Sequence, residues 1–175
     1  VVQMILGISG HRPQKIGCFG ENPLRGKVRQ KMREFFVEHK PSLVLTGMAL
    51  GVDQWAAELA ISLKIPFYAY VPFQGQEAKW PLDQQAYYGR LLQAAGKVIY
   101  CTNPGYAAWK MQRRNELLVN ACDHLLAVFD GSPSGTANCI AYAEQKKRPI
   151  TMIDPSALTW VDAQKTELNA TKGIK

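Results

Sequence analysis

Residues 42–64 read SLVLTGMALGVDQWAAELAISLK, and this stretch decides the fold. Its first five residues form a short apolar run with the length and composition of a buried strand. Residues 53–64 combine strong helix formers with an apolar face, and Pro66 ends the segment. Residues 47–51 hold two glycines and form the turn between the two segments. The stretch therefore predicts a strand, a glycine turn and a helix, which is the repeating unit of an α/β protein.

The same alternation continues on both sides of this stretch. Further strands are expected at residues 4–9, 67–71, 97–101, 124–129 and 148–153. Helices are expected at residues 27–39, from about residue 84 through 94–95, and at 109–121 and 136–147, with loops at 17–26, 72–83, 103–107 and 131–135. Near-continuous apolar strands are buried on both faces, and strand–helix–strand units give parallel pairing. The predicted fold is a Rossmann-like, doubly wound α/β domain with a mainly parallel sheet of about six strands and helices on both faces.

This domain is expected to span residues 1–154, and residues 155–175, which are polar with little periodicity, form a tail or a short docking segment. The apolar runs are too short to span a bilayer, and no signal-type segment precedes the first strand. A cytoplasmic protein without a membrane partner is the expectation. The cysteines show no CxxC pair and the histidines no metal-ligand spacing, so reduced thiols, no metal and no cofactor are expected.

The 175-residue chain carries a net charge of +7 and 47% hydrophobic residues. The hydrophobic content suffices for a substantial core, and the positive charge favours anionic partners such as nucleotides or nucleic acid. Arg25, Arg29 and Arg33 follow helical spacing, with Lys27 and Lys31 beside them. This basic helix is either a solvated face or a surface for nucleic acid or a protein partner.

The candidate ligand site consists of residues that follow the strands, because ligands of such sheets bind beyond the carboxyl ends of the strands. After the first strand come Gly10 and His11, of which the glycine permits a sharp turn, and Arg12 supplies a planar cation for phosphate. After the second strand, the turn amides lie at a helix N-terminus, which is an anion site. That turn contributes Gly47, Met48, Ala49, Gly51 and Asp53. Asp53 either caps the helix or contacts a ribose hydroxyl.

Three more segments complete the candidate site. Glu77 and Trp80, after the third strand, suit a polar partner for ribose and a wall for a base; the alternative is an ordered loop pinned by Phe73 and Trp80. Arg114 and Asn115 lie on the helix after the fourth strand, where adjacent residues diverge by roughly 100°, so only one of Arg113 and Arg114 faces a small ligand. The turn after the fifth strand is a second phosphate cradle, in which Thr136 alternatively caps the helix. This cradle comprises Asp130, Gly131, Ser132, Ser134, Gly135 and Thr136.

At these residues the sequence resembles the SLOG superfamily, and most closely its YpsA-like branch. The similar pieces span residues 4–154 and are found at residues 10–13, 46–54, 111 with 114–115, and 130–131 leading to 135–136. The resemblance implies a Rossmann-like fold with a pocket for a nucleotide derivative. Lonely Guy enzymes, which cleave the N-glycosidic bond of nucleoside monophosphates, share Met111 and Arg114. Their catalytic glutamate falls at or near Asn138 here, an amide that cannot act as a base.

DprA-type DNA-processing proteins carry a glycine-rich stretch similar to residues 46–57, and they bind single-stranded DNA. The leading hypothesis is nevertheless a sensor or sequestering protein for a nucleotide or nucleotide-derived signalling molecule. The alternatives are a nucleotide N-glycosidic hydrolase with Glu77 as the acid or base, and binding of single-stranded nucleic acid. Relatives in this superfamily are associated with phage defence and often form dimers, so a homo-oligomer is expected.

Overall fold

A computed structural model of the chain describes residues 3–17 and 20–158. Six parallel strands form one sheet in the order β4-β3-β2-β1-β5-β6. Their bounds are β1 Ile5–Gly10, β2 Leu43–Thr46, β3 Phe67–Val71, β4 Lys97–Tyr100, β5 His124–Val128 and β6 Ile150–Ile153. β1 is central, and pairs through Leu6 with Val44 of β2 on one side and with His124 of β5 on the other. This is the predicted Rossmann-like α/β fold.

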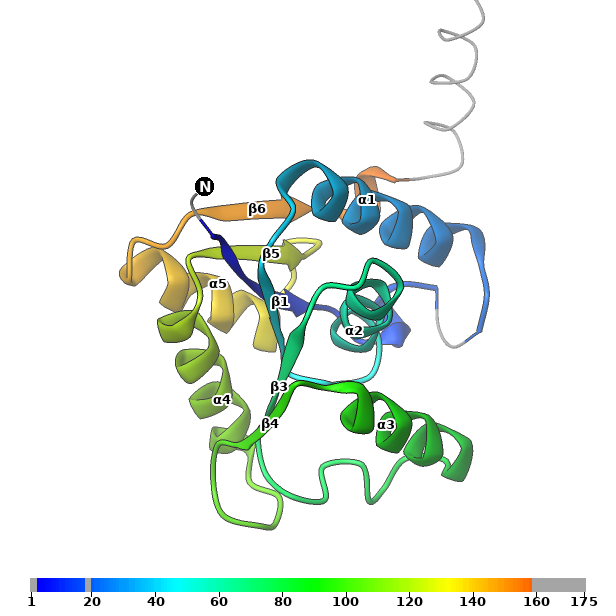
Figure 1. Ribbon diagram of the computed structural model, residues 1–175, viewed down its shortest axis with the longest axis vertical. Helices are drawn as coiled ribbons and strands as arrows, with labels where there is room; N and C mark the ends of the chain where they lie inside the picture. Colours follow the sequence, from blue (N-terminus) through cyan, green and yellow to red (C-terminus); the bar gives the residue numbers. More distant parts are fainter. Residues whose placement is uncertain (1–2, 18–19, 159–175) are drawn as a thin grey trace, which may run out of the picture.

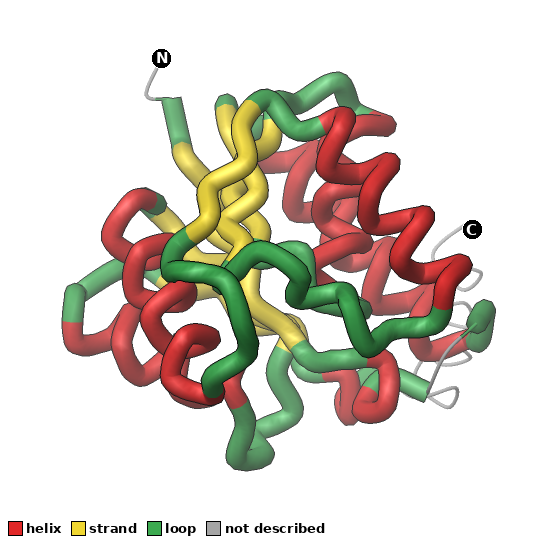
Figure 2. The backbone as a smooth tube through the Cα atoms, turned by 90° about the horizontal axis from the view of Figure 1, so that it is seen from below, coloured by secondary structure: helices red, strands yellow, loops and turns green. Residues whose placement is uncertain are grey.

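Helices cover both faces of the sheet (Figures 1 and 2). The first three, α1 (Pro23–His39), α2 (Val52–Ser62) and α3 (Leu82–Ala94), lie on one face. α4 (Ala108–Ala121) and α5 (Gly135–Gln145) lie on the other. The chain builds the sheet outward from β1 to β4, then returns across it through α4 to place β5 on the free side of β1. The topological switch point therefore lies between β1 and β5.

Each face of the sheet has its own apolar core. On the α1–α3 face, Leu6 and Ile8 of β1 pack among buried residues that include Phe36 and Trp55. On the α4–α5 face, Leu125 and Leu118 belong to a smaller core. Because side chains alternate along a strand, β strands covered on both sides read as continuous apolar runs. These two cores hold the carboxyl ends of the strands in fixed positions.

The predicted loop at residues 17–26 is wrong over residues 23–26, because α1 begins at Pro23. Asn22 caps this helix by accepting a 2.9 Å hydrogen bond from the Arg25 amide, and Pro23 at the first helical position has no amide to satisfy. The bounds of the remaining strands and helices agree with the prediction to within two residues. Two short 3₁₀ helices, η1 (Pro13–Lys15) and η2 (Pro155–Ala157), were not expected from the sequence.

Other expectations from the sequence concern membranes, metals and thiols. None of the helices within residues 3–17 and 20–158 is long and apolar enough to cross a bilayer. The same residues contain no cluster of three His, Cys, Asp or Glu side chains suited to a metal ion. Cys101, Cys122 and Cys139 are free thiols, and burial raises the pKa of Cys139 to about 11. Cys18 and the tail from residue 159 onward lie outside the described residues.

Candidate functional site

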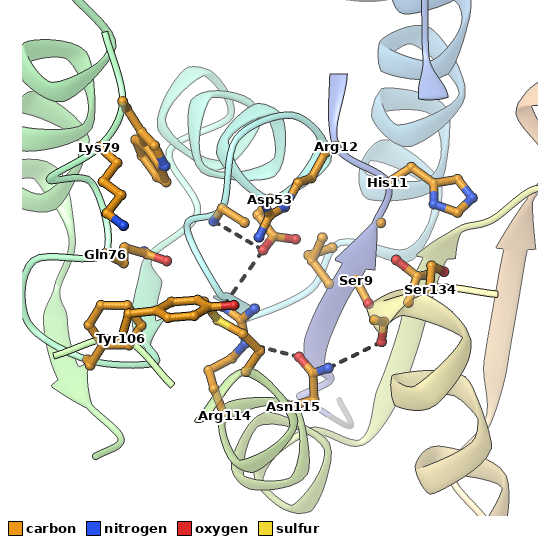
Figure 3. A pocket seen from close by; sticks show the side chains of 18 of the residues that line it. Ser9, His11, Arg12, Asp53, Gln76, Lys79, Tyr106, Arg114, Asn115 and Ser134 are labelled. Atoms are coloured by element: carbon orange, nitrogen blue, oxygen red, sulfur yellow. Dashed lines mark hydrogen bonds and ion pairs between the residues drawn. The ribbon is translucent and has the colours of Figure 1, made fainter. Parts of the chain in front are cut away.

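A cleft of about 1030 Å³ lies at the carboxyl edge of the sheet, over the switch point between β1 and β5 (Figure 3). Its walls come from residues 8–15 at the end of β1, from the β2–α2 and β3–α3 loops, and from the segments that begin α4 and α5. The volume is at the upper end of the range for small-molecule sites. The cleft is where the fold class predicts a ligand.

The structure brings most of the predicted site residues together in this cleft. Those that line it are Gly10, His11, Arg12, Ala49, Asp53, Trp80, Arg114, Asn115, Ser134, Gly135 and Thr136. The others do not line it: Gly47, Met48, Gly51, Glu77, Asp130, Gly131 and Ser132. Several of these lie directly behind the lining residues and hold them in place.

Arg114 lies at the bottom of the cleft with only 7% of its surface exposed. Its Nη1 donates hydrogen bonds to the carbonyl oxygens of Gly47, at 2.7 Å, and Tyr70, at 3.4 Å. Nη1 also lies 3.9 Å from a carboxylate oxygen of Asp53. Arg114 thereby ties α4 to the turn that follows β2 and to the carboxyl end of β3. Of its nitrogens, Nη2 has no hydrogen-bond partner among the described residues.

Asn115 extends this network toward α5. Its Oδ1 accepts a 3.0 Å hydrogen bond from Arg114 Nε, and its Nδ2 donates to the Gly135 carbonyl at 3.3 Å. Arg113 is exposed and pairs with Glu116 at 3.5 Å. Only one of the two adjacent arginines therefore faces the cleft, and it is Arg114.

Asp53 occupies the first turn of α2 and is almost completely buried. Its Oδ2 accepts a 3.2 Å hydrogen bond from the Ala49 amide. Burial raises the pKa of this carboxyl, whereas the Arg114 guanidinium acts in the opposite direction. Asp53 therefore closes the β2–α2 turn by binding its amide, and the same carboxylate balances the buried charge of Arg114. Among the described lining residues it is the only carboxylate.

The turn after β5 is fastened to the end of β1 by His11. The His11 Nε2 accepts a 3.0 Å hydrogen bond from the Asp130 amide and lies 2.8 Å from the Asp130 carboxylate. Hydrogen bonds from Ser132 hold the pKa of Asp130 far below its usual range, and burial lowers the pKa of His11. Lys15 contacts the Ser132 hydroxyl. Asp130 and Ser132 therefore fix the turn that carries the cleft residue Ser134, and they do not face the cleft.

The N-terminus of α5 opens into the cleft. Ser134 is its cap and accepts a 3.2 Å hydrogen bond from the Ala137 amide. The alternative prediction that Thr136 caps the helix is therefore wrong. The amides of Gly135 and Thr136 lie in the first turn, where no intrahelical acceptor exists and the helix dipole is positive. This end of the cleft is suited to an anion.

The opposite wall is aromatic and polar. Phe73 is buried, and its ring meets the exposed Tyr106 edge to face with 6.1 Å between centroids. Trp80 and the exposed Lys79 also line the cleft. Tyr106, Lys79 and Lys15 were missed from the sequence. Tyr106 could have been predicted, because it lies in the loop between β4 and α4, and ligands of such sheets contact the residues that follow each strand.

Glu77 is not brought to the cleft. Its Oε2 is enclosed and has no hydrogen-bond partner within residues 3–17 and 20–158, and its charge acts on Tyr88. The basic helix α1 is likewise not a free cationic face. Arg29 forms a 2.6 Å ion pair with Glu58 of α2, and the Arg25 guanidinium lies 5.1 Å from the centre of the Trp55 ring. These two arginines connect α1 to α2.

Fold and site together define a Rossmann-like domain with a cation-rich cleft beyond its strand ends. Comparison with known proteins identifies the family: the YpsA model, described as the YspA SLOG family, matches residues 6–158. The chain belongs to this family. The SPbeta prophage-derived protein YoqJ of Bacillus subtilis strain 168 is 32% identical over 145 residues, covering 71% of this chain and 85% of the relative. A UPF0398 protein of Bacillus thuringiensis strain Al Hakam is 27% identical over 157 residues, covering 83% and 85%.

Solved structures with the same fold have low sequence identity. DNA processing protein A of Streptococcus pneumoniae gives a TM-score of 0.64 at 16% identity, over 87% of this chain and 50% of that protein. This chain therefore spans half the length of that neighbour. The Helicobacter pylori protein of the same name, described with single-stranded DNA, gives 0.64 at 17% identity, over 86% and 65%. The molybdenum cofactor carrier protein of Chlamydomonas reinhardtii gives 0.57 at 18% identity, over 93% and 87%.

Proposed function

We propose that this protein binds a nucleotide or nucleotide-derived small molecule in the cleft and acts as a sensor or sequestering protein. The observation that carries the proposal is the charge of the lining. Four cationic side chains line the cleft, namely Arg12, Lys15, Lys79 and Arg114, against the single carboxylate of Asp53. That carboxylate is already engaged by the Ala49 amide and by Arg114. An anionic ligand is therefore favoured over a neutral or cationic one.

The two ends of the cleft suit two parts of a nucleotide. The first-turn amides of α5, with Lys15 in contact with Ser132 of the preceding turn, are suited to phosphate. Arg12 lies within electrostatic reach of Asp53 and adds a second cation to the cleft. The wall of Phe73, Trp80 and Tyr106 offers the flat apolar surfaces on which a base stacks. Between them, Asp53 presents a carboxylate to a ribose hydroxyl. The prophage origin of the Bacillus subtilis relative is compatible with a nucleotide signal in phage defence.

The test is calorimetric titration of the full chain with a panel of nucleoside mono- and diphosphates, together with mass spectrometry of small molecules that co-purify. Arg12→Ala should weaken binding about tenfold or more, because a charge-assisted hydrogen bond contributes about 1.5–3 kcal/mol. Arg33→Ala, which removes the same charge from an exposed position on α1, is the matched control and should bind as the parent does. Equal affinity of the Arg12→Ala variant and the parent would remove the end of β1 from the site.

Single-stranded DNA is a second candidate, because Tyr106 and Trp109, 71% and 60% exposed, form an aromatic rim beside the cleft. Exposed aromatic side chains near cations are typical of single-strand binding. Tight, strongly salt-dependent binding of an oligonucleotide without affinity for mononucleotides would favour this function. Release of free base or ribose phosphate from the nucleotide panel would instead reveal a hydrolase. Glu77 lies outside the cleft lining, so the geometry does not favour hydrolysis through that residue.

A further inference from the structure

Lys110 is a buried lysine that does not line the cleft, and none of the ligand contacts proposed above involves it. It lies in the first turn of α4 with 5% of its surface exposed. Its Nζ donates hydrogen bonds to three consecutive carbonyl oxygens, those of Asn103 at 2.8 Å, Pro104 at 3.2 Å and Gly105 at 2.7 Å. An ammonium group has three N–H donors, so every one of them is used on this short segment.

The carbonyl groups that Lys110 binds do not need a lysine to satisfy their hydrogen bonds. Asn103, Pro104 and Gly105 are all exposed, so water could satisfy their carbonyl groups. Burying an ammonium group, in contrast, has a substantial desolvation cost. The Lys110 Nζ also lies over two rings, 5.6 Å from the centre of Phe73 and 5.7 Å from that of Trp109. The benefit that offsets the desolvation cost is a fixed backbone course for residues 103–105.

The residue that follows this segment is Tyr106. Gly105 adopts a φ of 94°, a conformation that residues with a side chain rarely adopt, and this turns the chain so that Tyr106 projects from the rim. Tyr106 lines the cleft, and the edge-to-face contact with Phe73 is its one ring contact among the described residues. In Figure 3 its side chain lies on the opposite side of the cleft from His11 and Ser134.

We infer that Lys110 is a positioning residue for the part of the site that binds the base. By fixing residues 103–105 it holds Tyr106 against Phe73, so that the Tyr106 ring is already placed to stack on a planar heterocycle. The inference rests on the proposed function and adds that the ligand carries an aromatic base at this wall. A ring held in place before binding loses less conformational freedom when the ligand arrives, which increases affinity.

Lys110→Met tests this, because methionine keeps the length and apolar stem of lysine but cannot donate to the three carbonyl groups. The probes are the four ribonucleoside monophosphates and ribose 5-phosphate, which has the same sugar and phosphate without a base. Lys110→Met should weaken binding of the best nucleoside monophosphate about tenfold, since the base would lose much of its stacking on an aromatic side chain. Its affinity for ribose 5-phosphate should equal that of the parent.

Tyr106→Ala is the second variant, and it is safe for folding because Tyr106 is exposed. It should show the same base-selective loss, and adding Lys110→Met to it should cause no further loss, since Lys110 acts through Tyr106. Lys97→Met is the control for charge, because Lys97 is exposed at the amino end of β4, away from the cleft. It should bind both probes as the parent does.

Hydrogen exchange gives a readout that needs no ligand. The amides of residues 103 and 105–107 should exchange faster in Lys110→Met than in Lys97→Met, whereas those of β4 should not differ. The inference is overturned if these rates are equal, or if Lys110→Met weakens both probes alike or neither. If the parent binds none of the nucleoside monophosphates, the proposed function fails and the base-binding role fails with it, even where the exchange data show that Lys110 orders the segment.

Discussion

At Gly47 the backbone leaves room for a guanidinium group because the residue has no side chain. A Cβ atom built at this position would lie 1.7 Å from Arg114 Nη1 and 2.9 Å from Asp53 Oδ2. The Gly47 carbonyl oxygen accepts hydrogen bonds from both Arg114 and Gln76, at 2.7 and 3.3 Å. Gly47 therefore serves the ligand site from behind, by letting α4 and the β3–α3 loop meet on one carbonyl group.

Gly47→Ala should consequently destabilise the protein by about 2–4 kcal/mol, because it displaces a buried arginine from its carboxylate and carbonyl partners. The free energy of unfolding, measured with urea, tests this. The matched control is Gly26→Ala in α1, where a Cβ atom meets no other atom within 4 Å. That substitution should stabilise the protein by about 0.5–1 kcal/mol, since glycine is unfavourable within a helix. Equal effects at the two glycines would show that Arg114 has space to move aside.

For single residues, the sequence predicted which ones lie close together at the strand ends, but not which of them line the cleft. The turn at residues 47–51 and Arg114 are both part of the site, yet Gly47, Met48 and Gly51 lie behind the lining. Arg114 or Arg113 was expected to face a small ligand; Arg114 lines the cleft, but its hydrogen bonds among the described residues go to carbonyl oxygens and to Asn115. The direction of a side chain depends on contacts between residues far apart in the chain, such as Arg114 with Gly47, and no local pattern encodes them.

Among the elements, α2 and α5 both begin at the edge of the cleft, and their N-termini are closed differently. α2 has no side-chain cap; Asp53 within its first turn binds the Ala49 amide and places a carboxylate there. α5 is capped by the neutral Ser134, and its first turn carries no acidic residue. Because a carboxylate already neutralises the dipole of α2, the N-terminus of α5 is the better site for a phosphate.

Ser134→Asp distinguishes the role of Ser134 as the cap of α5 from the role of this helix end in binding a ligand. Aspartate caps helices as well as serine does, so the stability of the protein should change by less than about 0.5 kcal/mol. Its charge would repel a phosphate at the same helix end, and nucleotide affinity should fall about tenfold or more. Thermal unfolding and calorimetric titration together measure both effects. Ser134→Ala is the complement: it should lose about 1 kcal/mol of stability and keep most of the affinity. Unaltered affinity in Ser134→Asp would place the phosphate elsewhere.

Most elements could be predicted because their apolar periodicity is strong, as in residues 53–64. The predicted loop at residues 17–26 extends past the start of α1 because glycine, here Gly26, is typical of loops, although Asn22 followed by Pro23 is a recognised start of a helix. The 3₁₀ helix η1 could not be predicted, since one turn has no measurable period. It matters for the site because it carries Lys15, which lines the cleft.

In the whole molecule, the cleft depends on two halves of the sheet that come from successive parts of the sequence. β1 to β4 grow in one direction, and β5 and β6 are added on the other side of β1. The site spans this junction, with Ala49 and Tyr106 from the first half and Ser134 from the second. His11 connects the halves directly, through its backbone amide to Val128 at 3.2 Å and through its ring to Asp130.

This junction should make the stability of the molecule depend on pH. Burial holds the pKa of His11 below its ordinary value of 6.5. The charges of Asp130 and Asp154 act to raise this pKa, whereas the charge of Lys15 lowers it further. Between the lowered pKa and 6.5 the unfolded chain therefore binds more protons than the folded one. The free energy of unfolding must fall as the pH decreases through this window.

His11→Gln removes this titration, so its free energy of unfolding should decrease less than that of the parent between about pH 7.5 and pH 5.5. His124, whose pKa burial also lowers, is present in both proteins and cancels in the difference. Asp130 cancels as well, because its pKa is lowered from an ordinary value of 3.8 and it stays ionised throughout this range. Urea unfolding at several pH values measures the effect. Parallel curves for the two proteins would mean that His11 accepts a proton in the folded state as readily as in the unfolded chain, and that its ring can leave the Asp130 amide without cost to the junction.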